Sequence, residues 1–105
     1  MNIPPKTGAL LGLAKKARLL QSGESAVLAA MKKKAVMLLI IADDLPEKRR
    51  AHWQKWCETN NTNCITMGTK EEYGRLLGIS ARSILVITDM KMADAIIKTI
   101  RTSAE

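Results

Sequence analysis

The fold is decided by residues 22–44, SGESAVLAAMKKKAVMLLIIADD, which predict a helix followed by a buried strand. The helix is expected over residues 23–34, and Ser22 has the side chain of a good N-cap. The strand is expected over residues 35–42, and because it is apolar throughout, both of its faces should be covered. The buried face of the helix is expected to carry Val27, Leu28 and Met31.

Helical and strand patterns alternate on both sides of this segment. Further helices are expected over residues 7–17, 44–59, 69–78 and from 89 onward, and further strands over residues 18–21, 64–67 and 83–88. The first helix is expected to bury a stripe made of Ala9, Leu10, Leu13, Ala14 and Ala17. Alternation of this kind predicts an α/β fold, with a central, largely parallel sheet and helices on both of its faces.

Three polar residues are expected to start helices. Asp44 precedes Pro46 and Glu47, Thr69 opens a capping-box pattern with Glu72, and Asp89 follows the last apolar strand. Within the helix expected over residues 44–59, Trp53, Trp56 and Cys57 are expected to point inward, which makes the tryptophans part of the core.

The positive charge of the chain is concentrated near its start. The formal net charge is +7, and residues 1–34 hold seven Lys or Arg against one Glu, while residues 35–105 hold ten against nine Asp or Glu. An excess of this size points to a polyanionic partner, most often nucleic acid. The backbone N–H groups at the start of the helix after Ser22-Gly23 would suit a phosphate, although the same turn also fits an ordinary helix cap.

Candidate catalytic and metal-binding residues are few. Asp43 and Asp44 end a buried strand and could hold Mg²⁺ in a phosphotransfer enzyme, but no further groups accompany them and Asp44 suits a helix cap. Cys57, Cys64 and His52 match no zinc pattern, so we expect reduced thiols in a cytoplasmic protein. We therefore expect no catalytic residue, no metal and no cofactor, and no segment that enters a membrane.

Five pieces of the sequence, in this order, carry a family resemblance: LLGLAKKAR at 10–18, SGE at 22–24, LLIIADD at 38–44, YGRLLG at 73–78 and ILVITD at 84–89. Together they make the chain resemble the kink-turn-binding ribosomal protein family, the L-seven-Ae / L-thirty-e superfamily, and most of all its small bacterial YlxQ-type members. The resemblance implies a three-layer α-β-α sandwich around a mixed, mostly parallel four-stranded sheet. It also implies a single RNA-binding domain over residues 1–105 that is a monomer and not an enzyme.

The same resemblance implies where RNA would bind. The partner would be ribosomal or another structured RNA, with a kink-turn or an internal loop, held by the start of the second helix and by the loop before the last strand. These elements map to Gly23, Glu24, Ser25 and Lys33, and to Ile79, Ser80, Ala81 and Arg82; Lys32 is a further candidate for phosphate. Ser25, Ala26 and Ala29 stand where other members carry Asn, Glu and Lys, so the polar contacts to bases are fewer here.

Two other functions remain open from the sequence. One is a substrate-binding module related to the accessory domains of RNA methyltransferases, and the other is a ribosome-associated module that binds proteins. Lys15, Lys16 and Arg18 could extend a basic RNA-binding surface, or serve solubility alone.

Overall fold

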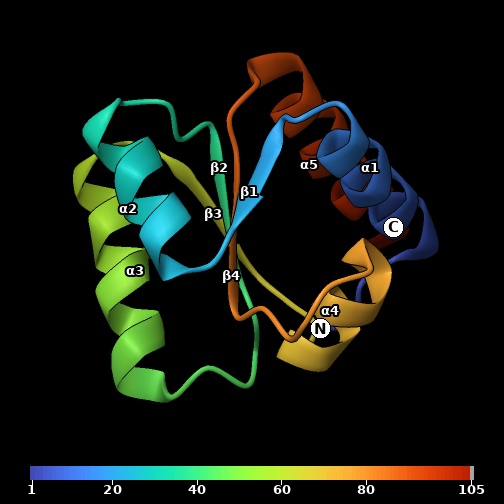
Figure 1. Cartoon of the computed structure of the whole chain (residues 1–105), viewed down its shortest axis with the longest axis horizontal. Coiled ribbons are helices and arrows are strands. Elements are labelled where there is room, and N and C mark those ends of the chain that lie inside the picture. The colour runs from blue at the N-terminus through green and yellow to red at the C-terminus, as the bar shows by residue number, and fades with distance from the viewer. Residues whose placement is uncertain (105) are drawn as a thin grey trace.

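The chain forms a four-stranded sheet with helices packed on both of its faces (Figure 1). The structure is a computed structural model that describes residues 1–104. Its elements are α1 (Pro5–Lys16), β1 (Leu20–Ser22), α2 (Glu24–Lys32), β2 (Leu38–Ile41), α3 (Glu47–Thr59), β3 (Asn63–Thr66), α4 (Lys70–Leu77), β4 (Ile84–Ile87) and α5 (Met90–Ala104). The predicted α/β class, with a mixed four-stranded sheet between two layers of helices, is confirmed.

The direction of the strands differs from the expectation. The strand order is β1-β4-β2-β3, and only β2 and β3 are parallel, because β4 runs antiparallel to both β1 and β2. The prediction of a mostly parallel sheet is therefore wrong. Apolar runs report that a strand is buried on both faces, and they carry no information about which way it runs.

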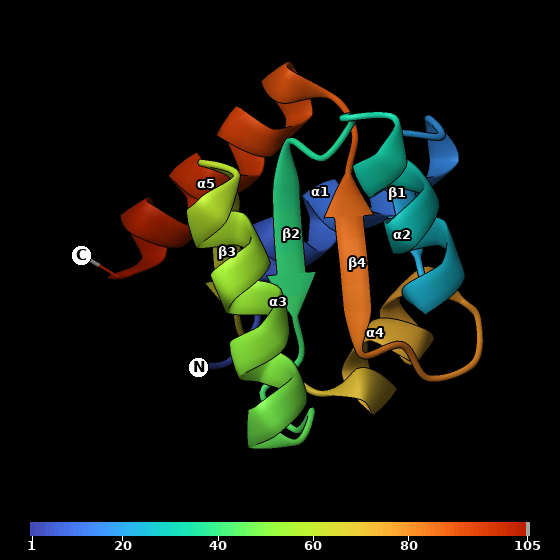
Figure 2. The ribbon, with the colours of Figure 1, turned by 90° about the vertical axis from the view of Figure 1, so that its left-hand side faces the viewer.

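The sheet separates two apolar cores. Every residue of β2 and β4 is buried, and successive side chains point to opposite faces. Leu38, Ile40, Leu85 and Ile87 join the core under α1, α4 and α5. Leu39, Ile41, Ile84 and Val86 join the core under α2 and α3, which lie in front of the sheet in Figure 2. The prediction that the strand after the second helix is covered on both faces is confirmed.

The buried face of α1 differs from the prediction, and the buried face of α2 agrees with it in part. In α1 the buried residues are Thr7, Gly8, Leu11 and Ala14, whereas Leu13 is 55% exposed. In α2, Val27 is buried and Met31 packs against the core, as predicted, but Ala30 is buried in place of Leu28, which is 44% exposed. For α1, the neighbouring α4 and α5 set the buried face, and a hydroxyl-to-hydroxyl hydrogen bond of 2.8 Å between Thr7 and Thr99 places a polar residue inside it.

The caps at the helix starts are partly as predicted. Thr69 and Glu72 form the capping box of α4, and Asp89 accepts a hydrogen bond from the Met92 N–H of α5. Ser22, in contrast, belongs to β1 and caps nothing, and no side chain caps α3. Asp44 instead accepts a hydrogen bond from the N–H of Lys70, so it serves the helix 26 residues further along the chain.

Candidate functional site

Gly23 makes the turn from β1 into α2. Its N–H donates to the carbonyl oxygen of Ile84 at 3.0 Å, and its dihedral angles, φ +91° and ψ +156°, lie in a region that is essentially open to glycine alone. No side chain caps the helix, so the N–H groups of Glu24, Ser25 and Ala26 have no acceptor within residues 1–104. The first turn of α2 therefore presents free donors at the positive end of the helix dipole.

The loop between α4 and β4 is held close to that turn. The Nη1 of Arg82 donates to the carbonyl and hydroxyl oxygens of Ser80, at 3.1 and 2.6 Å, and to the carbonyl of Ala81 at 3.1 Å. On the other side of the loop, a Cβ at Gly74 would lie 3.0 Å from backbone atoms of Ala81. Glycine at position 74 thus lets the loop backbone rest directly on α4.

These two elements form the walls of one groove with a volume of about 590 Å³. The groove is lined by Ser22, Gly23, Glu24, Ser25, Ala26, Leu45, Arg49, Trp53, Ala81, Arg82, Ser83 and Ile84. The Nε of Arg82 lies 3.9 Å from the position that a Cβ on Gly23 would occupy, so the guanidinium stands beside the uncapped turn. A fixed cation and free backbone donors converge here, which is the arrangement that binds phosphates and other anions.

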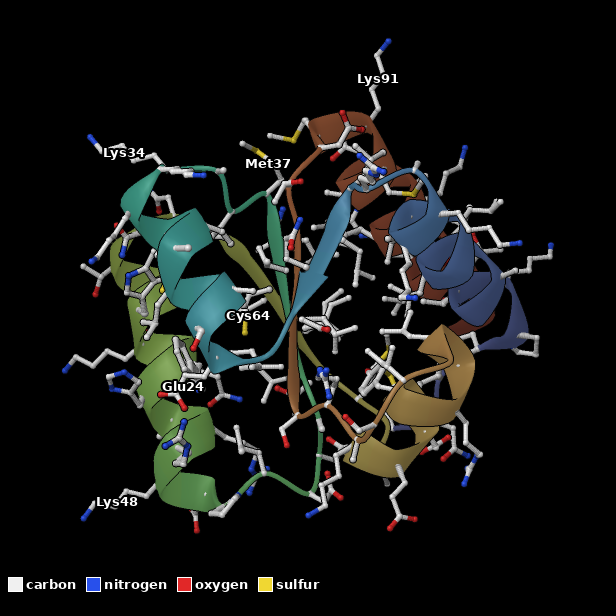
Figure 3. All side chains as sticks on the ribbon, viewed as in Figure 1. Glu24, Lys34, Met37, Lys48, Cys64 and Lys91 are labelled. Carbon is white, nitrogen blue, oxygen red and sulfur yellow. The ribbon has the colours of Figure 1, made fainter. Side chains whose placement is uncertain are left out.

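Arg49 of α3 completes the groove and was not predicted. It forms an ion pair of 2.9 Å with Glu24, whose position at the first turn of α2 is labelled in Figure 3. Both side chains are about half exposed, at 48% and 54%, so the pair adds little to stability but offsets the carboxylate's repulsion of an anion. No local pattern signals this residue, because it lies 25 positions from Glu24.

The remaining predicted residues lie outside the groove. Ile79 is half-buried against the core under α1, α4 and α5, and Ser80 contributes through its bonds to Arg82. Lys32 and Lys33 stand at the opposite end of α2 from Gly23. Lys33 lines a second, smaller depression, which shares Ala26 with the groove and so continues it along the helix.

Asp43 and Asp44, the two carboxylates considered for Mg²⁺, each contact a different part of the chain. Asp43 forms a 2.8 Å ion pair with the amino group of Met1, and Asp44 bonds to the backbone of α4. Within residues 1–104 no group of three or more His, Cys, Asp or Glu side chains is arranged to hold a metal ion. None of the described helices is long and apolar enough to cross a lipid bilayer.

The two cysteines meet between α3 and β3 as reduced thiols. Cys57 is buried and Cys64 is half-buried, and both belong to the core under α2 and α3. A hydrogen bond to Cys64 and burial raise the pKa of Cys57. Accepting that hydrogen bond lowers the pKa of Cys64.

We expect iodoacetamide at mildly alkaline pH to modify Cys64 in the folded protein and to spare Cys57. The thiolate is the nucleophile, and a lowered pKa increases its population at Cys64, whereas a raised pKa and burial suppress it at Cys57. Mass spectrometry of tryptic peptides gives the site of alkylation, and Cys64→Ser is the control that should remain unmodified until it unfolds. Equal modification of both thiols in the folded protein would contradict this assignment.

An α/β sandwich with an open helix start beside a basic loop is suited to binding a ligand. Comparisons with known proteins show the family to which the chain belongs. The model of the ribosomal protein L7Ae/L30e/S12e/Gadd45 family matches residues 6–97, so the chain belongs to this family. Among solved structures, it is similar to a protein of unknown function from Bacillus halodurans, with 26% identity, a TM-score of 0.86, and coverage of 93% of this chain and 99% of that one.

A second solved structure extends the likeness in fold. The 15.5kD RNA binding protein of Giardia lamblia has 18% identity and a TM-score of 0.75, and the match covers 92% of this chain and 86% of that one. No curated protein matches the sequence.

Proposed function

We propose that the protein binds structured RNA, of the kink-turn or internal-loop type, in the groove between the start of α2 and the α4–β4 loop. The observation that carries the proposal is the position of Arg82 beside the uncapped first turn of α2. Membership of a ribosomal protein family supports an RNA partner, as does the likeness in fold to an RNA-binding protein. The family name also favours a role with the ribosome or in translation.

The groove has donors for phosphate and few groups for reading bases. The N–H groups of Glu24, Ser25 and Ala26 and the guanidinium of Arg82 suit phosphate oxygens, and the Ser25 hydroxyl adds one hydrogen bond to a base edge or a 2′-OH. The side chains of Ala26 and Ala29 offer only contact surface. Phosphate contacts therefore supply most of the affinity, and binding should fall steeply as salt rises.

We expect Arg82→Ala to weaken binding to an internal-loop RNA hairpin by roughly tenfold or more. The reason is that a hydrogen bond from a charged group contributes about 1.5–3 kcal/mol. Fluorescence anisotropy with a labelled hairpin measures the affinity, and a fully paired hairpin of equal length tests whether the loop matters. Arg101→Ala removes the same charge from an exposed position on α5 and should have little effect. Equal affinities of Arg82→Ala and the unmodified protein would remove the groove as the RNA site.

A further inference from the structure

Three turns form one end of the molecule, opposite the start of α2. The turn after α1 joins the turn after β4, because the N–H and hydroxyl of Thr88 donate to the carbonyl of Leu19 at 2.9 and 3.3 Å. The turn after α2 joins them through the N–H of Met37, which donates to the carbonyl of Ile87 at 2.9 Å. Figure 1 shows the three turns together at the top, and Figure 3 places Lys34 and Lys91 there, with Glu24 well below.

This end, here called the basic end, gathers much of the positive charge of the chain. Its seven exposed cations are Lys15, Lys16, Arg18, Lys32, Lys33, Lys34 and Lys91. The neighbouring carboxylates are those of Glu58 on α3, Asp94 on α5 and Asp89 just before α5, and Asp89 already bonds to the backbone of α5. Neither of the two ion pairs within residues 1–104 involves any of the seven, so their charge is free to act on a partner.

Helix dipoles explain only some of these cations. Lys15, Lys16 and Lys32 stand in the last turns of α1 and α2, where a positive charge is favourable. Lys91 stands in the first turn of α5, where the dipole disfavours it.

Arg18 and Lys34 are also placed against local preference. Their φ angles are +62° and +55°, the left-handed conformation that most often holds glycine at a helix end. Both helix ends are built in the same way, with the next N–H donating back to Ala14 at 2.8 Å and to Ala30 at 2.9 Å. Arg18, Lys34 and Lys91 therefore occupy positions where the backbone conformation or the helix dipole favours other residues.

We propose that the basic end binds the phosphate backbone of a duplex arm belonging to the RNA that occupies the groove. This inference rests on the proposed function and adds a second, separate contact with the same RNA. The depression lined by Ala29 and Lys33 shares Ala26 with the groove, so the surface is continuous from Gly23 to the basic end. Gly23 in the groove and Lys32 at the basic end lie about 13 Å apart along α2, given a rise of about 1.5 Å per residue. That continuity favours RNA over an anionic membrane or an acidic protein.

The test uses a triple variant, Arg18→Gly, Lys34→Gly and Lys91→Gln. Glycine removes the charge and also suits the left-handed backbone, so the melting temperature should not fall. The matched control is Lys48→Gln, Lys55→Gln and Lys98→Gln, which removes three exposed cations from α3 and α5. Thermal unfolding by circular dichroism is measured for both variants first.

Binding is then compared on two RNA hairpins over a range of salt concentrations. Both contain the same internal loop, one with long duplex arms and one with the shortest arms that still pair. On the long RNA, log K falls as log salt rises, and the triple variant should make this slope shallower by about 2–3, since each phosphate contact contributes roughly 0.7–0.9. On the short RNA it should bind like the unmodified protein, and the control should match the unmodified protein on both.

The inference is overturned if the triple variant and the control lose the same slope on the long RNA, or if neither loses any. It is also overturned if the triple variant keeps its RNA binding but loses binding to vesicles of anionic phospholipid, which would assign the basic end to a membrane. If the groove is not the RNA site, a different measurement shows it: Arg82→Ala then binds the short RNA as tightly as the unmodified protein does. The two proposals can therefore fail separately.

Discussion

Trp53→Ala is expected to lower the free energy of unfolding by about 3–5 kcal/mol, the range for removing a large buried aromatic side chain. Trp53 is 2% exposed and lies in the core under α2 and α3, where it also forms part of the groove wall. Its ring meets that of His52 edge to face, with centroids 5.2 Å apart. Urea denaturation followed by circular dichroism measures the loss.

Trp53→Phe is the matched control for this substitution. The indole Nε1 is buried and has no hydrogen-bond partner in the described structure, so the loss of that donor removes no bond. An aromatic ring still fills most of the space, and we expect a cost below about 1.5 kcal/mol. A cost for phenylalanine as large as that for alanine would show that the indole N–H makes a bond that matters.

Gly74→Val is expected to displace the α4–β4 loop and to weaken RNA binding together with stability. A Cβ at this position would lie 3.0 Å from the backbone of Ser80 and Ala81, and backbone atoms cannot move aside as the end of a flexible side chain can. Overpacking of this kind costs about 1–3 kcal/mol of folding free energy. Because the moved loop carries Arg82, affinity for the internal-loop hairpin should fall by about tenfold or more, as in Arg82→Ala.

Gly12→Val separates these effects from a general cost of valine in a helix. Gly12 lies in α1, and a Cβ there would meet nothing within 4 Å. This variant should keep its RNA affinity and change the free energy of unfolding by no more than about 0.5 kcal/mol. If both glycine variants bind RNA equally well, the position of the loop does not control the site.

The elements could be predicted from the sequence because each has a local signal. The apolar run of β2, the capping box at Thr69 and the cap at Asp89 depend on neighbours within a few residues. The buried faces of α1 and α2 depend on which elements pack against them, helices α4 and α5 for α1 and strands β1 and β4 for α2. That information is not local, and a mixed pattern such as Leu10, Leu11 and Leu13 allows more than one buried face.

The candidate site is predictable in part for the same reason. The turn and the family resemblance point to Gly23, Glu24 and Ser25, and these line the same groove as Ala81 and Arg82. Arg49 contributes through an ion pair across 25 residues, which no spacing rule detects. The groove therefore combines two elements that the sequence points to with a third, α3, that only packing in space supplies.

The central place of β4 has a consequence for the order of folding. Within the described sheet, β1 pairs only with β4, and β4 lies between β1 and β2 as the last strand in the chain. During synthesis from the N-terminus, residues 20–22 have no partner until residues 84–87 are made. Pairings between such distant segments close large loops and slow folding. The sheet is thus completed late, by a strand that enters between two earlier ones.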